Sequence, residues 1–85
     1  MEVKMKDLPF KVYFIYVEYD GKRYWYANKG GGAWGLSPYM VDAMPLTAKY
    51  LRKVREKLNR YSEIMYKDVV IPVHNHKTIM YTSLG

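Results

Sequence analysis

The chain has 85 residues, no cysteine and a formal net charge of +6 at pH 7. At this length we expect one domain, residues 1–85, with a small core and marginal stability. The absence of cysteine excludes disulfide frameworks, cysteine-ligated zinc and thiol catalysis.

No segment of the sequence is typical of a signal peptide or a membrane span. The first six residues, MEVKMK, contain no apolar core of signal-peptide length. The longest apolar run, Val12 to Val17, is far shorter than the roughly 20 residues that a spanning helix needs. We therefore expect a cytoplasmic protein with no membrane partner.

The first predicted element is a β-hairpin over residues 10–28, which follows a polar lead-in at residues 1–9. Its first strand reads FKVYFIYVEY and is rich in the β-branched and aromatic residues that favour strands. Asp20 and Gly21 form a dipeptide that supplies the positive φ angles of a tight hairpin turn. The return strand contains the run RYWY.

Residues 29–47 are predicted to form a glycine-rich loop and a short helix. The loop, KGGGAWG, matches neither the P-loop spacing nor the dinucleotide-binding fingerprint. We interpret it as a flexible connection that lets Trp34 pack against the sheet, rather than as a phosphate site. Ser37 is the expected N-cap and Pro38 the first helical residue, and the helix should end before Pro45.

A longer amphipathic helix is predicted over residues 48–61, with Thr47 as its N-cap. Four apolar residues recur at spacings of three and four and define its buried stripe: Leu51, Val54, Leu58 and Tyr61. Between Lys49 and Arg60, six basic residues stand against one acid, Glu56, so this segment holds +5 of the chain's charge. A charge excess on one element indicates an anionic partner.

The C-terminal strand and tail are expected within residues 62–85. Ile64–Val73 is the predicted strand, with Pro72 placing its end at a sheet edge, and Thr78–Thr82 could form a short fourth strand. The predicted fold class is α+β, in ββαβ order. A small antiparallel sheet, made of the hairpin and the C-terminal strand or strands, packs on one long basic amphipathic helix.

The first strand is apolar on both faces, and a single helix covers only one face of a small sheet. Three interpretations of the second face stay open. The glycine-rich loop, the short helix and the C-terminal tail could cover it. It could instead be a homodimer interface, or a binding platform of aromatic side chains.

The sequence offers little for catalysis or metal binding. The serines lie in no nucleophile motif, and Glu18 and Asp20 flank a hairpin turn, where acidic residues are ordinary. We therefore expect no enzyme activity and no cofactor. His74 and His76 lie on the same side of an extended segment and could supply half a metal site. No third ligand stands at a recognisable spacing, so a polar strand end is the preferred interpretation.

The layout over residues 10–73 resembles that of many small proteins encoded by phages and prophages. These proteins have a hairpin with tryptophan or tyrosine on its return strand, a segment similar to VDAMPLTA at residues 41–48, a charged helix and a final strand. The resemblance implies a host-interaction or regulatory protein in the cytoplasm of a bacterial host cell.

The sequence thus predicts a small non-enzymatic binding module that engages nucleic acid or a nucleoprotein. The candidate contacts are basic side chains of the helix and nearby aromatic side chains: Lys49, Arg52, Lys53, Lys57, Arg60, Tyr24, Trp25, Tyr26 and Trp34. One alternative is a protein-binding inhibitor of a bacterial defence system or a host enzyme, such as an anti-CRISPR-like protein that meets an acidic or nucleic-acid-binding protein. Another is a structural homodimer.

Overall fold

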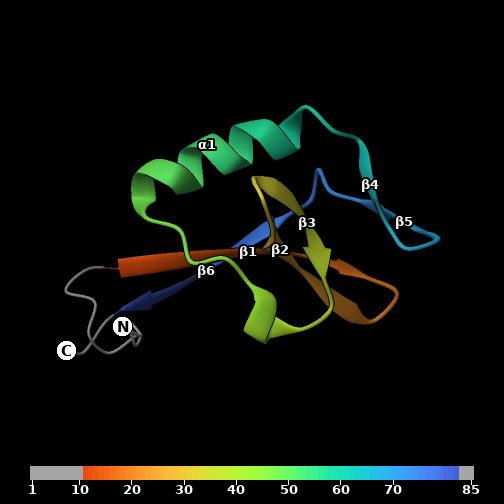
Figure 1. The fold of residues 1–85 in the computed structure, drawn as a ribbon, viewed down its shortest axis with the longest axis horizontal. Coiled ribbons are helices and arrows are strands. Elements are labelled where there is room, and N and C mark those ends of the chain that lie inside the picture. The colour runs from red at the N-terminus through yellow and green to blue at the C-terminus, as the bar shows by residue number, and fades with distance from the viewer. Residues whose placement is uncertain (1–10, 83–85) are drawn as a thin grey trace.

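A computed structural model describes residues 11–82, which form two antiparallel sheets and one α-helix (Figure 1). The elements in chain order are β1 (Lys11–Tyr19), β2 (Lys22–Gly30), β3 (Ala33–Ser37), the 3₁₀ helix η2 (Met40–Asp42), α1 (Ala48–Asn59), β4 (Glu63–Tyr66), β5 (Val69–Pro72) and β6 (Lys77–Thr82). The larger sheet has the order β3-β2-β1-β6, and β4 pairs with β5. The α+β class is confirmed, whereas the ββαβ order is wrong because three further strands flank the helix.

The predicted hairpin is confirmed as β1 and β2. Asp20 and Gly21 form its turn with φ angles of 53° and 75°, the left-handed region that a tight two-residue turn requires. Tyr19 pairs with Lys22 directly beside this turn. β1 is buried on both faces along most of its length, as its two-sided apolar sequence predicts.

The glycine-rich segment is a hairpin turn rather than a loose connection. β2 continues to Gly30 and β3 begins at Ala33, so the glycines reverse the chain between two paired strands. All three glycines of this turn have positive φ, between 58° and 91°. The side-chain oxygen of Asn28 accepts a 2.7 Å hydrogen bond from the Gly30 N–H and holds the turn.

The short helix predicted after Ser37 is present only as a 3₁₀ helix, and it begins later than predicted. Ser37 is the last residue of β3, and only Met40–Asp42 form a 3₁₀ turn. The Ser37 hydroxyl donates a 2.7 Å hydrogen bond to Asp42 and accepts one from the Tyr39 N–H. Farther on, Leu46 exchanges two backbone hydrogen bonds of 2.8 Å with Tyr13. Because these bonds fasten the segment to the sheet, its backbone stays extended.

The main helix α1 is shorter than predicted and has 12 residues. Thr47 is its N-cap as expected, and its hydroxyl oxygen accepts a hydrogen bond from the Tyr50 N–H. The helix ends at Asn59. Beyond this end, the Tyr61 N–H donates a hydrogen bond to the Leu58 carbonyl, three residues back in the chain. Tyr61 is therefore not part of the helix, and the predicted helix over residues 48–61 is too long by two residues.

The predicted strand Ile64–Val73 is instead a hairpin, β4 and β5, with a turn at Lys67 and Asp68. Lys67 has a φ of 55°, which permits this reversal without a glycine. The fourth strand expected at Thr78–Thr82 is confirmed as β6. It pairs antiparallel with β1 and forms an edge of the larger sheet.

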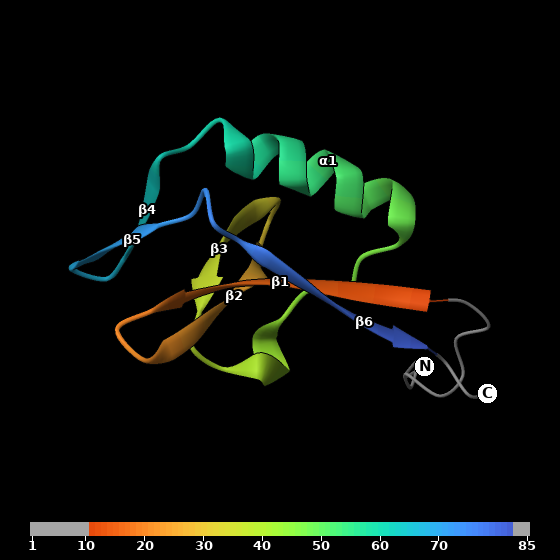
Figure 2. The same cartoon turned by 180° about the vertical axis from the view of Figure 1, so that it is seen from behind.

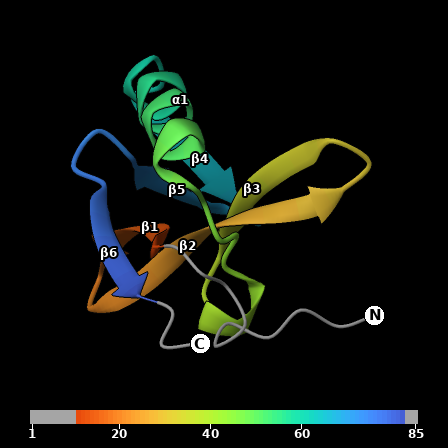
Figure 3. The same ribbon diagram turned by 90° about the vertical axis from the view of Figure 1, so that its left-hand side faces the viewer.

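The core is divided between the two faces of the larger sheet. On one face, α1 covers a cluster of Ile15, Tyr26, Leu46, Val54 and Leu58. Beside it, β5 and the residue that follows it cover a second cluster of Val17, Tyr24, Leu36, Ile71 and Val73. The opposite face carries a third cluster of Val12, Phe14, Tyr16 and Trp25. Viewed from the end, α1 and η2 lie on opposite sides of the sheet (Figure 3), and from behind β6 crosses below α1 (Figure 2).

Candidate nucleic-acid interface

The outer face of α1 is basic and exposed. Val54 and Leu58 are buried against the sheet, so the residues half a turn away point to solvent. Five basic residues on α1 and its C-cap are exposed: Lys49, Arg52, Lys53, Arg55 and Arg60. Glu56 is the one acid among the residues of α1. We define this set of five cations as the outer basic face.

No carboxylate of the described chain forms an ion pair with the outer basic face. Within residues 11–82, the ion pair present joins Lys77 to Glu18 at 2.7 Å, and both lie outside α1. Among the residues of α1, only the single charge of Glu56 opposes these cations. Such a surface attracts polyanions and raises their local concentration.

Lys57 belongs to the same helix but lies in a different environment. Its side chain is half-buried, and its ammonium donates a 2.7 Å hydrogen bond to the Tyr26 hydroxyl. The same nitrogen lies 5.0 Å from the ring centroid of Tyr26 and 4.4 Å from that of Trp34. Of the predicted contact residues, Lys57 is therefore engaged within the fold by a hydrogen bond and two cation–π contacts.

Three of the predicted aromatic contacts lie in the core. Tyr24, Trp25 and Tyr26 are all buried. Trp25 faces the side of the sheet opposite α1 and packs on Tyr16, with ring centroids 5.2 Å apart. These rings have no free face to stack on a partner, so a binding role for them is not supported by their position.

Trp34 is the predicted aromatic contact that the fold leaves half-buried. It lies 5.5 Å from Tyr26, centroid to centroid, and 5.5 Å from Tyr61, which it meets edge to face. The alternation of β3 turns the Trp34 side chain toward α1. Trp34 therefore joins the sheet to the helix and reaches the molecular surface beside it.

Two exposed tyrosines near α1 were not among the predicted contacts. Tyr50 is 55% exposed and Tyr61 is 44% exposed. The Lys53 ammonium lies 5.6 Å from the Tyr50 ring centroid. A signal for Tyr50 was available in the sequence, because Tyr50, Lys53 and Lys57 recur at spacings of three and four and so share one flank of a helix.

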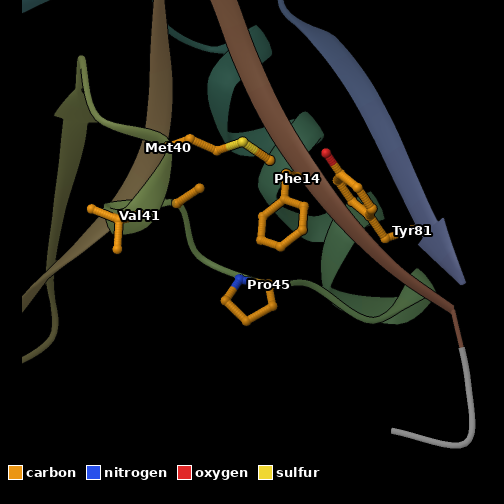
Figure 4. A pocket seen from close by; sticks show the side chains of 6 residues that line it. Phe14, Met40, Val41, Pro45 and Tyr81 are labelled. Atoms are coloured by element: carbon orange, nitrogen blue, oxygen red, sulfur yellow. The ribbon is translucent and has the colours of Figure 1, made fainter. Parts of the chain in front are cut away.

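The second face of the larger sheet is partly covered by the segment between β3 and α1. Ala43 packs against the cluster on this face. Its position is fixed by a β-bridge with Ala27 and by the hydrogen bond that the Met44 N–H donates to the Tyr26 carbonyl. An open apolar groove of about 460 Å³ remains, lined by Phe14, Met40, Val41, Ala43, Pro45 and Tyr81 (Figure 4). The connecting segment thus covers part of this face, as one of the three interpretations proposed, while β6 extends the sheet instead of folding over it.

The two histidines lie in the connection between β5 and β6. His76 Nδ1 is 2.9 Å from the Val73 carbonyl oxygen, which requires a proton on that nitrogen. A shallow depression here is lined by Glu18, His74, Asn75, His76 and Lys77. Within residues 11–82, no three His, Cys, Asp or Glu side chains are grouped so as to hold a metal ion. The described residues therefore offer these two histidines no third metal ligand.

No family model, curated protein or solved structure matches this chain. Among the described residues, no helix combines the length and the apolar character needed to cross a membrane.

Proposed function

We propose that this protein is a non-enzymatic module that binds nucleic acid, alone or within a nucleoprotein, through the outer basic face. One observation carries the proposal. Five exposed cations lie on one 12-residue helix and its C-cap, and no described carboxylate pairs with them. An ordinary solvated helix face mixes charges of both signs, whereas this one contains only Glu56 as an acid.

The spacing of the cations suits a polyanion with regularly repeated charges. From Lys49 to Arg60 the helix rises roughly 16 Å, and successive turns bring a new basic side chain to the surface about every 5.4 Å. A nucleic-acid strand presents one phosphate per about 3.4 Å of a duplex axis. The outer basic face is therefore long enough to meet several phosphates, and its arginines can bind phosphate oxygens through two parallel hydrogen bonds.

The test is a charge reversal with a matched control. Fluorescence anisotropy would measure binding to labelled single-stranded and duplex DNA and RNA at low salt. We expect Arg52→Glu/Lys53→Glu to weaken binding by about a hundredfold, because two phosphate contacts become repulsive. The control, Lys22→Glu/Lys67→Glu, changes the net charge equally at two exposed positions outside α1, the first residue of β2 and the turn between β4 and β5.

The control variant should lose only the modest affinity that follows from a lower net charge. Equal losses in both variants would contradict a specific role for α1. If the folded wild-type protein bound none of the four nucleic acids, the proposal would be wrong, and the protein-binding alternative would become the one to pursue.

A further inference from the structure

We propose that the nucleic acid is single-stranded and lies along the flank of α1 that faces β3. This flank carries three aromatic and two basic side chains, which we call the aromatic–basic track: Tyr50, Lys53, Lys57, Trp34 and Tyr61. The inference rests on the proposed function and specifies the class of its ligand. It is carried by the contacts among these side chains.

The track is continuous along the helix. Tyr50 lies in the first turn of α1 and Tyr61 follows its C-terminal end. Between them, Lys53 lies 5.6 Å from the Tyr50 ring centroid, and Lys57 lies 4.4 Å from that of Trp34. Trp34 then meets Tyr61 with ring centroids 5.5 Å apart. Each ring of the track thus has a cation or another ring of the track beside it.

The exposure of the rings leaves room for bases. Tyr50 and Tyr61 are 55% and 44% exposed, and Trp34 between β3 and α1 is half-buried. Single exposed tyrosines are common on protein surfaces and need no explanation. Here two of them, with a tryptophan between them, line the same flank of a helix that carries most of the chain's charge. Proteins that bind single strands combine these two features, stacking rings and a basic path for the backbone.

The opposite flank of α1 lacks this combination. A depression there is lined by Ala48, Leu51, Arg52, Arg55, Glu56 and Asn59. It contains no aromatic ring, and it includes the helix's carboxylate. A single-stranded nucleic acid that contacts both cations and stacking rings would therefore lie on the Tyr50 side of α1.

A duplex would make no use of the rings. Its bases are paired and stacked within the helix, so it presents phosphates and groove edges rather than free base faces. A single strand exposes those faces, and every base has one, so stacking on tyrosine and tryptophan tolerates any sequence. DNA and RNA single strands share this chemistry.

The experiment compares ligands and variants by anisotropy at low salt. The probes are labelled oligo(dT), oligo(U) and a DNA duplex of the same length. We expect wild-type protein to bind at least one single strand about tenfold more tightly than the duplex. Tyr50→Leu/Tyr61→Leu should weaken single-strand binding by about tenfold or more and change duplex binding by less than about twofold.

Two further variants separate stacking from folding. Tyr50→Phe/Tyr61→Phe keeps both rings and should retain single-strand affinity. Tyr19→Leu/Tyr39→Leu removes two other exposed tyrosines, 37% and 64% exposed, and should leave binding unchanged. Binding of a single strand should also quench the emission of Trp34, since Trp25 is buried in the core.

Preference for oligo(dT) or for oligo(U) would support the inference equally and would identify the natural ligand class. Equal affinity for the duplex, or equal effects of the leucine variants and their control, would overturn it. In that case, loss of binding in Arg52→Glu/Lys53→Glu would still uphold the proposed function. Absence of binding to every probe would reject both.

Discussion

The environment of Lys57 predicts a structural role for a basic side chain. Its ammonium hydrogen-bonds the Tyr26 hydroxyl at 2.7 Å and lies over the rings of Tyr26 and Trp34. We expect Lys57→Met to lower the free energy of unfolding by about 1–2 kcal/mol, because the apolar stem is kept while the hydrogen bond and the cation–π contacts are lost. Urea denaturation followed by circular dichroism would measure the change.

Lys49→Met is the matched control, because Lys49 is exposed on the same helix. We expect its effect on stability to stay within about 0.5 kcal/mol. If the two variants had the same stability, the contacts of Lys57 would contribute nothing measurable.

The ion pair between Glu18 and Lys77 predicts a pH dependence of known sign. The Lys77 ammonium, 2.7 Å from Glu18 Oε1, lowers the pKa of Glu18 through the hydrogen bond first and its charge second. In return, Glu18 raises the pKa of Lys77. The pair therefore stabilises the fold at pH values above the ordinary glutamate pKa, and this contribution is lost as pH falls through the lowered pKa of Glu18.

At alkaline pH the contribution is complete below the ordinary lysine pKa and is lost as pH rises through the raised pKa of Lys77. A carboxyl-detected NMR titration would measure the pKa of Glu18 directly. We expect it to rise toward the ordinary glutamate value in Lys77→Met. An unchanged Glu18 midpoint would show that the pair is not formed in solution.

At the scale of elements, the sequence predicted the parts whose signals are local. Asp20 and Gly21 mark the first hairpin, and Thr47 caps α1 before a clear three-and-four spacing. The Ser37 helix signal failed because hydrogen bonds between Tyr13 and Leu46 fasten the following segment to the sheet. Propensity yields to tertiary contacts of this kind.

The missed strands have equally specific causes. A glycine run is typical of both a flexible loop and a hairpin turn, because both use positive φ. The five residues of β3 are also too few to show a clear alternation of apolar and polar side chains. The turn between β4 and β5 uses Lys67 at a φ of 55°, where no glycine or proline announces a reversal. The sequence therefore predicts one continuous strand over Ile64–Val73, where the structure has two strands joined by this turn.

The candidate site was predictable in its charge but not in its aromatic partners. The cations of α1 follow from composition and spacing alone. The burial of Trp25 and Tyr26 depends on α1 and the η2 segment covering opposite faces of one sheet, which no local pattern records. The sequence spacing places Tyr61 on the buried stripe of α1, but Tyr61 is exposed because the helix ends before it.

At the scale of the whole molecule, charge is segregated. The segment from Lys49 to Arg60 carries +5 of the chain's +6, so the rest of the protein is nearly neutral. α1 lies on one side of the larger sheet and η2 on the other (Figure 3). Met40 and Val41 of η2 line the apolar groove. A polyanion bound at α1 therefore meets the charged side of the molecule and leaves the apolar side free.

This segregation predicts the salt dependence of binding. If four of the exposed cations neutralise phosphates of a single strand, the logarithm of the association constant should fall with the logarithm of salt concentration with a slope of about −3. Each contact contributes about −0.7, so Lys53→Ala, a change on the aromatic–basic track, should make the slope shallower by about that amount. Lys22→Ala removes an equal charge from the start of β2 and should leave the slope unchanged. A slope near zero in the wild-type protein would show that few counterions are released, and stacking or a protein partner would then have to supply the affinity.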